Sequence, residues 1–126
     1  MKIRVEITRE PLVARGVTGP ENGAGAVVEF AGVVRGEEDG HVIAGLDYEA
    51  YEPMARSEME RLAGELSAVY PCYSMEVMHR IGHVPAGAAS ILVRVEAKHR
   101  AEAFGMLAEF MNRLKREVPI WKKVAT

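Results

Sequence analysis

The C-terminal segment, residues 98–123, constrains the fold of this chain more than any other stretch. It begins with a His-Arg pair and ends in basic residues around a proline, and apolar residues recur between them at helical spacing. The apolar positions that share one face are Ala103, Phe104, Leu107, Phe110, Met111 and Leu114. The segment therefore predicts a long amphipathic helix, which Pro119 ends in a rigid Pro-Ile-Trp turn.

Cationic side chains stand at both ends of this predicted helix. His99 and Arg100 open it, and Lys115 lies in its last turn. At ~1.5 Å per residue, a straight helix separates Arg100 from Lys115 by roughly 22–24 Å. One small ligand cannot contact both ends within one chain unless the tail folds back. Either the two ends serve separate purposes, or a second copy of the chain completes a shared site.

The distribution of charge favours a discrete anionic ligand over a nucleic acid. The net charge is −2, yet residues 1–93 carry 8 Lys/Arg against 14 Asp/Glu, and residues 94–126 carry 8 against 4. A long nucleic acid usually requires a basic domain, whereas a basic patch on an acidic body suits a small anion. The same cations also favour the end of a helix through its dipole, and that alternative stays open.

The chain as a whole is expected to form one domain, residues 1–126, in the cytoplasm. Its 126 residues are 48% hydrophobic, which is enough for a core. No stretch resembles a signal peptide or reaches the ~18 apolar residues of a membrane span. The four histidines have no metal-ligand spacing, so no metal site is expected.

Alternating and apolar runs predict an α+β fold. We expect strands at residues 2–7, 25–34, 42–51, 75–84 and 89–97, a short helix at 9–16, a break at 18–23, and a helix from 53 to about 70. The almost wholly apolar strand 25–34 is expected at the centre of the sheet, covered on both faces. The helix from Pro53 is expected to bury Ala55, Met59, Leu62, Leu66 and Val69. Hairpin connections indicate a largely antiparallel sheet with helices packed on it.

Two arginine positions could bind an anion. Arg35 follows the apolar strand and could present its guanidinium at a sheet edge, or pair with Glu37 or Glu38. His99 and Arg100 lie where a strand becomes a helix, a place that favours anions, and an Arg fork adds bidentate recognition. The alternative is that His99 only caps the start of the helix and Arg100 pairs with Glu102 or Glu96.

Lys115, Lys122 and Lys123 form a third group. A lysine near other cations and partly shielded from water could exchange protons near neutral pH, bind phosphate or form a Schiff base. The alternative is an ordinary basic tail. His79 shares the apolar alternation of its strand, which favours a packed, hydrogen-bonded histidine. Cys72 is the only cysteine and is expected to be a small packed residue.

Five segments in order make the chain resemble a known family. They are FAGVVR at 30–35, LDYEAY at 46–51, HRIG at 79–82, KHR at 98–100 and KREVPIWKK at 115–123. Together, over roughly residues 25–123, they look like the large, catalytic subunit of molybdopterin synthase, the MoaE family. The resemblance implies an α/β-hammerhead fold, with a mixed or antiparallel sheet, two main helices and a small β-subdomain.

The resemblance also implies an activity and its partners. The reaction would convert cyclic pyranopterin monophosphate (precursor Z) to molybdopterin by inserting two sulfurs. The sulfurs would come from the thiocarboxylated C-terminus of a small ubiquitin-like subunit, bound to a homodimer in a heterotetramer. No cofactor, nucleic acid or membrane is implied.

The resemblance assigns roles to individual residues. Lys115 and Lys122 would be catalytic, by proton transfer or transient attachment for Lys115. Phe30 and Met111 would wall the pocket. The substrate-binding residues would be Val33, Val34, Arg35, His99, Arg100, Lys115, Lys122 and Lys123, with the His-Arg pair supplied by the other protomer.

Two positions depart from the family pattern. Val33 replaces a threonine that is common in the family, and Val124 replaces a glutamate after the final lysines. Both changes remove a polar group, and the second could weaken docking of the partner's tail. A non-catalytic paralogue that dimerises and docks a ubiquitin-like sulfur-carrier protein is therefore the alternative function.

Overall fold

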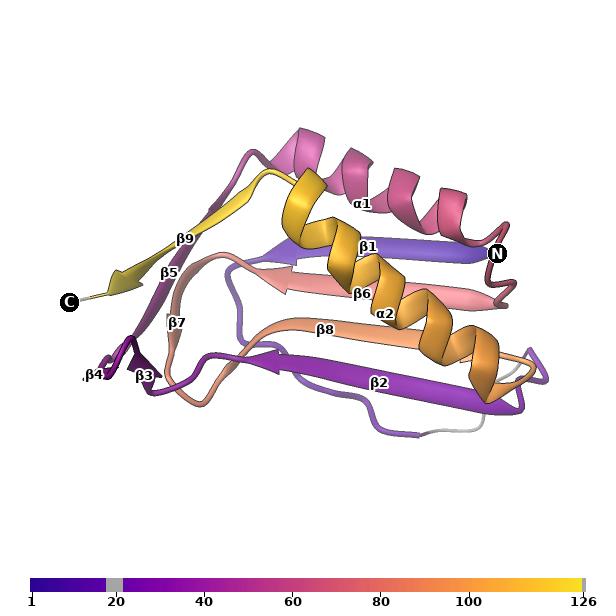
Figure 1. Ribbon diagram of the computed structural model, residues 1–126, viewed down its shortest axis with the longest axis horizontal. Coiled ribbons are helices and arrows are strands. Elements are labelled where there is room, and N and C mark those ends of the chain that lie inside the picture. Colours follow the sequence, from indigo (N-terminus) through magenta and orange to yellow (C-terminus); the bar gives the residue numbers. More distant parts are fainter. Residues whose placement is uncertain (18–21, 126) are drawn as a thin grey trace.

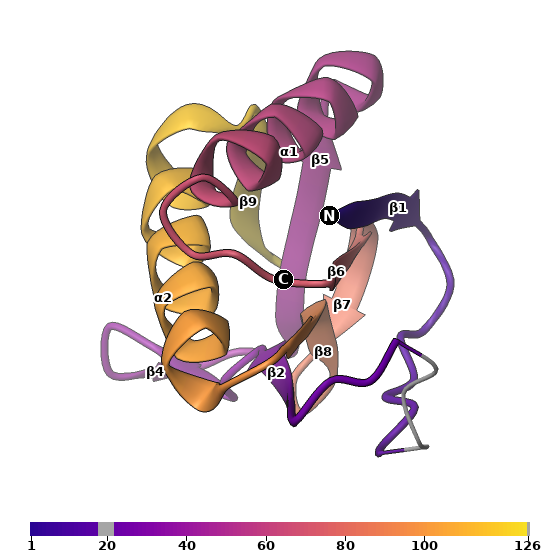
Figure 2. The same cartoon turned by 90° about the vertical axis from the view of Figure 1, so that its right-hand side faces the viewer.

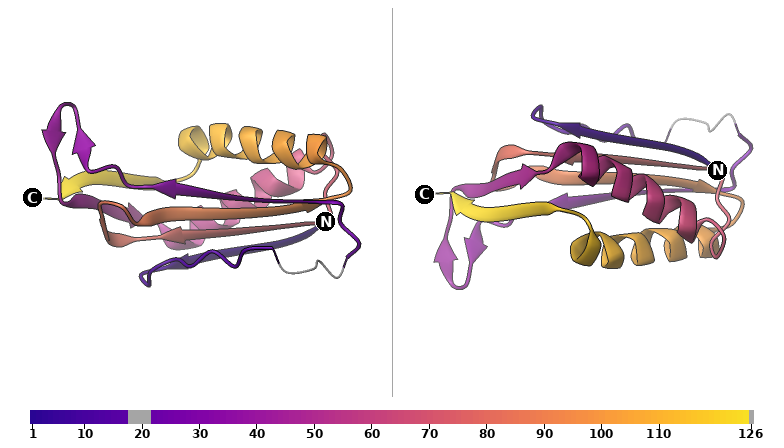
Figure 3. Two further views of the ribbon diagram at one scale, coloured as in Figure 1. Left: turned by 90° about the horizontal axis from the view of Figure 1, so that it is seen from below. Right: turned by 90° about the horizontal axis from the view of Figure 1, so that it is seen from above.

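A four-stranded sheet forms the centre of the computed structural model, which describes residues 1–17 and 22–125. Its order is β1 (Lys2–Thr8), β6 (Ser74–Arg80), β8 (Ala89–Ala97) and β2 (Ala26–Val33). β1 runs parallel to β6, and the other neighbours are antiparallel. Helices α1 (Glu52–Leu66) and α2 (Arg100–Glu117) cover one face, and the segment after β1 crosses the other (Figure 1, Figure 3).

A second, three-stranded sheet lies beyond one end of the first. It has the order β7 (Gly82–Pro85), β5 (Gly45–Ala50) and β9 (Ile120–Ala125), all antiparallel. Next to it, β3 (Glu37–Glu38) and β4 (His41–Val42) form a hairpin that projects on the same side as the helices (Figure 3). Asp39 and Gly40 both have positive φ, as a type I′ hairpin turn requires. The predicted α+β fold with two helices on a mixed sheet and a small β-subdomain is confirmed.

The main core lies between the helices and the four-stranded sheet, as the view along the strands shows (Figure 2). α1 begins with Pro53 in its first turn, where a missing N–H costs nothing. Its buried residues are Ala55, Met59, Leu62, Ala63 and Leu66. α2 buries Ala103, Met106, Phe110 and Leu114. No helix in the described ranges is long and apolar enough to cross a membrane.

Several predicted boundaries are wrong. Residues 9–16 form no helix, and Gly16 takes a positive φ that a right-handed helix does not contain. The strand expected at 42–51 begins only at Gly45, after the hairpin. α1 ends at Leu66 rather than near residue 70, so Val69 is exposed rather than in the core. The predicted break at 18–23 lies largely outside the described residues.

The apolar strand at 25–34 is not central. β2 is the edge of the main sheet, so among the described residues only β8 pairs with it. One face of β2 packs under α2, where Val28 and Phe30 contact the core, and the opposite face is only partly covered. The apolar composition therefore indicated burial by a helix, and not a neighbour on each side.

The predicted strand at 75–84 is two strands in two sheets. β6 ends at Arg80, and Gly82 with a φ of +83° turns the chain into β7. The hairpin of residues 75–84 with 89–97 is confirmed only between β6 and β8, because β7 pairs with β5. After Pro119 the chain forms strand β9 rather than a rigid turn. Phe104, predicted on the buried face of α2, is exposed.

Candidate active site

The two ends of α2 carry the first predicted site residues. His99 occupies the N-cap position with an extended backbone but its side chain accepts no capping hydrogen bond, and its Nδ1 lies 3.9 Å from Glu102 Oε2. Arg100, the first helical residue, is exposed and makes no ion pair within residues 1–17 and 22–125. Glu96, one expected partner, is occupied by Arg94, Ser74 and Asn22. This arginine is therefore available to a ligand or a partner.

The C-terminal end of α2 is fixed to α1 by an ion-pair network. Arg113 Nε donates to Glu117 Oε2 at 2.8 Å, and Arg61 on α1 reaches Glu117 Oε1 at 3.2 Å. The hydrogen bond from Arg113, and to a lesser extent that from Arg61, lowers the pKa of Glu117 to about 2. Lys115 lies in the same turn, exposed and outside this network. The network thus fixes the backbone that carries Lys115 and leaves its ammonium group unpaired among the described residues.

Lys122 and Lys123 are separated by the pleat of β9. Lys122 is the cross-strand neighbour of Tyr48, and Lys123 is the neighbour of Asp47. Successive residues of a strand point to opposite faces, so the two lysines cannot line one surface of the sheet. Lys122 shares its face with Ile120, which packs against the main core, whereas Lys123 faces outward. The structure therefore does not bring Lys123 to the face of Lys122.

The end of β2 presents Arg35. A register irregularity after Gly32 turns the strand, and Val34 is buried in a small cluster with Leu46 and Val84. The backbone of Val34 is held on both sides, because its N–H donates to Ala88 at 2.9 Å and its carbonyl accepts from Gly87 at 2.8 Å. Arg35 itself is exposed and has no ion pair with Glu37 or Glu38 among the described residues.

The remaining predicted residues divide between surface and core. Val33 is 53% exposed at the end of β2. Phe30 and Met111 are half-buried and both pack against the main core, from β2 and from α2. They therefore lie between the sheet and the second helix, and their role as a pocket wall stays a prediction.

His79 and Cys72 are packed, as the sequence indicated. His79 is 4% exposed and its Nδ1 lies 2.8 Å from the Arg80 carbonyl oxygen. Burial lowers the pKa of His79. Burial also raises the pKa of Cys72, which disfavours the nucleophilic thiolate.

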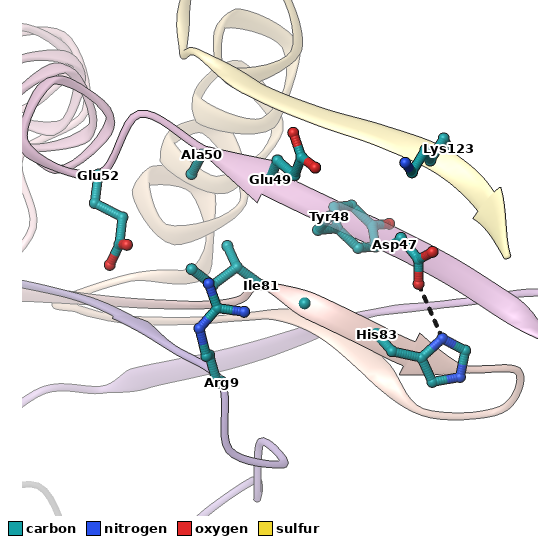
Figure 4. Close-up of a pocket in the computed structure, with 10 residues that line it drawn as sticks. Arg9, Asp47, Tyr48, Glu49, Ala50, Glu52, Ile81, His83 and Lys123 are labelled. Carbon is teal, nitrogen blue, oxygen red and sulfur yellow. Dashed lines mark hydrogen bonds and ion pairs between the residues drawn. The ribbon is translucent and has the colours of Figure 1, made fainter.

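A polar cavity that the sequence did not reveal lies beside β5 and β7 of the second sheet (Figure 4). His83 Nδ1 lies 3.0 Å from Asp47 Oδ1, and Lys123 is the neighbour of Asp47 on the other side. The cavity of about 460 Å³ is lined by Arg9, Asp47, Tyr48, Glu49, Ala50, Glu52, Ile81, Gly82, His83 and Lys123. Its cations and carboxylates are mixed, so it is less suited to a phosphate than the surface that carries Lys122.

The fold is that of a solved molybdopterin synthase. The X-ray crystal structure of Molybdopterin Synthase from Staphylococcus aureus matches with a TM-score of 0.86 and 35% identity, covering 95% of this chain and 89% of that one. A protein-protein complex of subunits 1 and 2 of the Molybdopterin-converting factor from Helicobacter pylori 26695 shares the fold, with a TM-score of 0.74, 24% identity, and coverage of 97% of this chain and 83% of that one.

The family model described as MoaE protein matches residues 6–117, and the chain belongs to this family. It is 43% identical over 102 residues to the Molybdopterin synthase catalytic subunit of Pyrococcus abyssi, across 81% of this chain and 69% of that protein. It is 37% identical over 99 residues to the human Molybdopterin synthase catalytic subunit, across 79% of this chain and 53% of that protein. The matched region thus spans from about half to about two thirds of these relatives.

Proposed function

We propose that the protein is the catalytic subunit of a molybdopterin synthase. It converts cyclic pyranopterin monophosphate to molybdopterin by transferring two sulfurs from the thiocarboxylated C-terminus of a small ubiquitin-like subunit. Because sulfur arrives on that subunit, this chain needs no cysteine nucleophile, which agrees with the packed Cys72. The family points to work in the cytoplasm as part of molybdenum cofactor biosynthesis.

One observation carries this proposal. Three cations are found at the end of the fold where the second sheet lies (Figure 1). Arg35 follows the end of β2, Lys115 is in the last turn of α2, and Lys122 belongs to β9. None of the three makes an ion pair within residues 1–17 and 22–125. Unpaired cations at one end of a fold are expected to bind an anionic substrate. Lys115 would transfer a proton or attach transiently, and Lys122 and Arg35 would orient the substrate.

A homodimer completes this site. α2 spans 18 residues from Arg100 to Glu117, so the His-Arg pair at its start cannot reach Lys115 near its end in the same chain. The unpaired edge of β2 and the 56% exposed Phe104 on α2 support a face for a second copy. If two copies align these elements antiparallel, His99 and Arg100 approach Lys115 of the partner subunit.

A small sulfur-carrier subunit is the second partner. The Helicobacter pylori relative of this fold was solved as a complex of two different subunits, which supports a heterotetramer here. Lys122 would meet the terminal thiocarboxylate, since it shares a face with Ile120, which packs against the main core, whereas Lys123 lines the polar cavity.

The direct test is a reconstituted reaction. Purified protein, precursor Z and a thiocarboxylated small subunit are incubated, and molybdopterin is measured. The control uses the small subunit with an ordinary C-terminal carboxylate, which carries no sulfur. More product than in this control supports the proposal. Absence of product, with the small subunit still bound in gel filtration, contradicts it.

That second outcome would favour a non-catalytic paralogue that docks the sulfur carrier. One observation keeps this alternative open. Val124, the position where the family resemblance implies a glutamate, is 46% exposed and lines a cavity of about 460 Å³ between β9 and the β3–β4 hairpin. An apolar side chain there offers a tail neither charge nor a hydrogen bond.

A further inference from the structure

Tyr48 lies at the centre of the second sheet, between two very different neighbours. On one side its cross-strand partner is Lys122 of β9, and on the other side it is Gly82 of β7. Directly opposed residues of an antiparallel pair have Cβ atoms about 4.5–5.5 Å apart, within reach of an aromatic ring. The ring of Tyr48 is therefore a neighbour of the aliphatic part of Lys122.

Gly82 leaves the other side of Tyr48 open. With no side chain on β7 at this position, the ring reaches His79 at the end of β6. The two rings meet edge to face, with centroids 5.4 Å apart and planes at 67°. His79 is 4% exposed and bound through Nδ1 to the Arg80 carbonyl, so it cannot swing away. Tyr48 thus rests on a fixed ring that belongs to the main sheet.

A small apolar cluster connects Tyr48 with the segment that presents Arg35. Tyr48 packs against this cluster, which consists of Val34, Leu46 and Val84. Val34 immediately precedes Arg35, and its backbone hydrogen bonds to Gly87 and Ala88 hold it in place. A change in the position of the Tyr48 ring would therefore alter the packing both at β9 and at the end of β2.

We propose that Tyr48, supported by His79, is a positioning residue that sets the placement of Lys122 relative to Arg35. This rests on the proposed function, in which both cations orient one anionic substrate. The ring and not the hydroxyl does this, because the contact with His79 is a contact of the ring. Catalysis is sensitive to such placement, since a shift of ~1 Å can cost about 100-fold in rate.

The first test is the turnover of three variants in the reconstituted assay. We expect Tyr48→Leu to lower kcat about tenfold or more and Tyr48→Phe to stay within about twofold of the wild type. Leu62→Ala, a buried change on α1 far from this cluster, controls for loss of stability. Wild-type kcat in folded Tyr48→Leu, equal losses in Tyr48→Phe, or an equal loss in Leu62→Ala would each overturn the proposal.

The second test needs no turnover. Brief acetylation followed by mass spectrometry gives the ratio of modification at Lys122 to that at Lys123, which faces the opposite side of the same strand. We expect the ratio to rise severalfold in Tyr48→Leu and to stay unchanged in Tyr48→Phe. An unchanged ratio in Tyr48→Leu contradicts the proposal. If the wild type makes no molybdopterin, the proposed function fails, and this ratio still decides the role of Tyr48.

Discussion

Lys122 and Lys123 are consecutive residues of β9, so their side chains lie on opposite faces of the second sheet. Lys122 is the cross-strand neighbour of Tyr48, and Lys123 is that of Asp47. The face of Lys122 continues into the main core through Ile120. The face of Lys123 carries the Asp47–His83 pair and opens to solvent. Two lysines that look equivalent in the sequence therefore meet different surroundings.

The two lysines are expected to differ in function. Lys122→Ala should lower the rate of molybdopterin formation by about 100-fold, because it removes a positioned cation from the anionic substrate. Lys123→Ala should cost much less. Steady-state kinetics of the two purified variants checks this difference, and equal losses would show that the outer face takes part in the reaction.

Lys115 is expected to be essential for chemistry and dispensable for folding. Its side chain is exposed and outside the Arg61–Arg113–Glu117 network, so Lys115→Ala should keep the melting temperature. Turnover should fall by at least about 100-fold, the usual range for a proton-transfer group. Arg116→Ala, one residue further along the same exposed turn, is the matched control. Wild-type turnover of Lys115→Ala would remove this residue from the mechanism.

The stability of the fold should fall in mild acid through His79. Burial, opposed by a weaker effect of the hydrogen bond to Arg80, holds the pKa of His79 below its ordinary value of 6.5. Below pH 6.5 the unfolded chain binds a proton that the folded chain does not, so the free energy of unfolding decreases by up to ~1.4 kcal/mol per pH unit. Above pH 6.5 the contribution is constant.

Urea unfolding between pH 5 and pH 8 measures this slope. His79→Gln should flatten the part of the slope below pH ~6.5. His41→Gln, at an exposed position of the hairpin, should leave the slope as it is. An unchanged slope in His79→Gln would show that the buried ring does not resist protonation.

Two helical glycines should respond in opposite directions to alanine. A Cβ on Gly105 would run into the ring of Tyr70, so Gly105→Ala should destabilise the protein by about 1–3 kcal/mol. A Cβ on Gly64 of α1 meets no atom within 4 Å, and Gly64→Ala should stabilise it by up to ~1 kcal/mol. Thermal unfolding of both variants checks the contrast, and stabilisation by Gly105→Ala would contradict the packing of α2 against Tyr70.

The sequence predicted the helices and strands themselves better than it predicted which strands lie next to one another. Helical spacing located α1 and α2, because one buried stripe leaves a strong pattern. The apolar composition of residues 25–34 led to the wrong prediction that this strand is central. An apolar strand has the same composition whether a second strand lies beside it or a helix covers it. One strand ends at Arg80 and the next begins at Gly82, and the positive φ of Gly82 left no trace in the alternation of residues 75–84.

The site was predicted in part for a similar reason. Arg35, Arg100 and Lys115 could be named because they stand at the ends of recognisable elements. Lys122 and Lys123 were grouped because the segment after Pro119 was interpreted as a turn, and alternation separates neighbours only in a strand. The Asp47–His83 pair was missed because the two residues are distant in the sequence and meet only through the register of β5 and β7.

The most direct test of this account is a subunit-mixing experiment with two inactive variants. Lys115→Ala and Arg100→Ala affect opposite ends of α2, so a mixed dimer has one site with Lys115 from one chain and Arg100 from the other. After exchange of subunits in the reconstituted assay, the mixture should regain about a quarter of wild-type molybdopterin formation, since half the dimers carry one intact site. If each variant is inactive and the exchanged mixture also stays inactive, the site is not shared between two copies as proposed here.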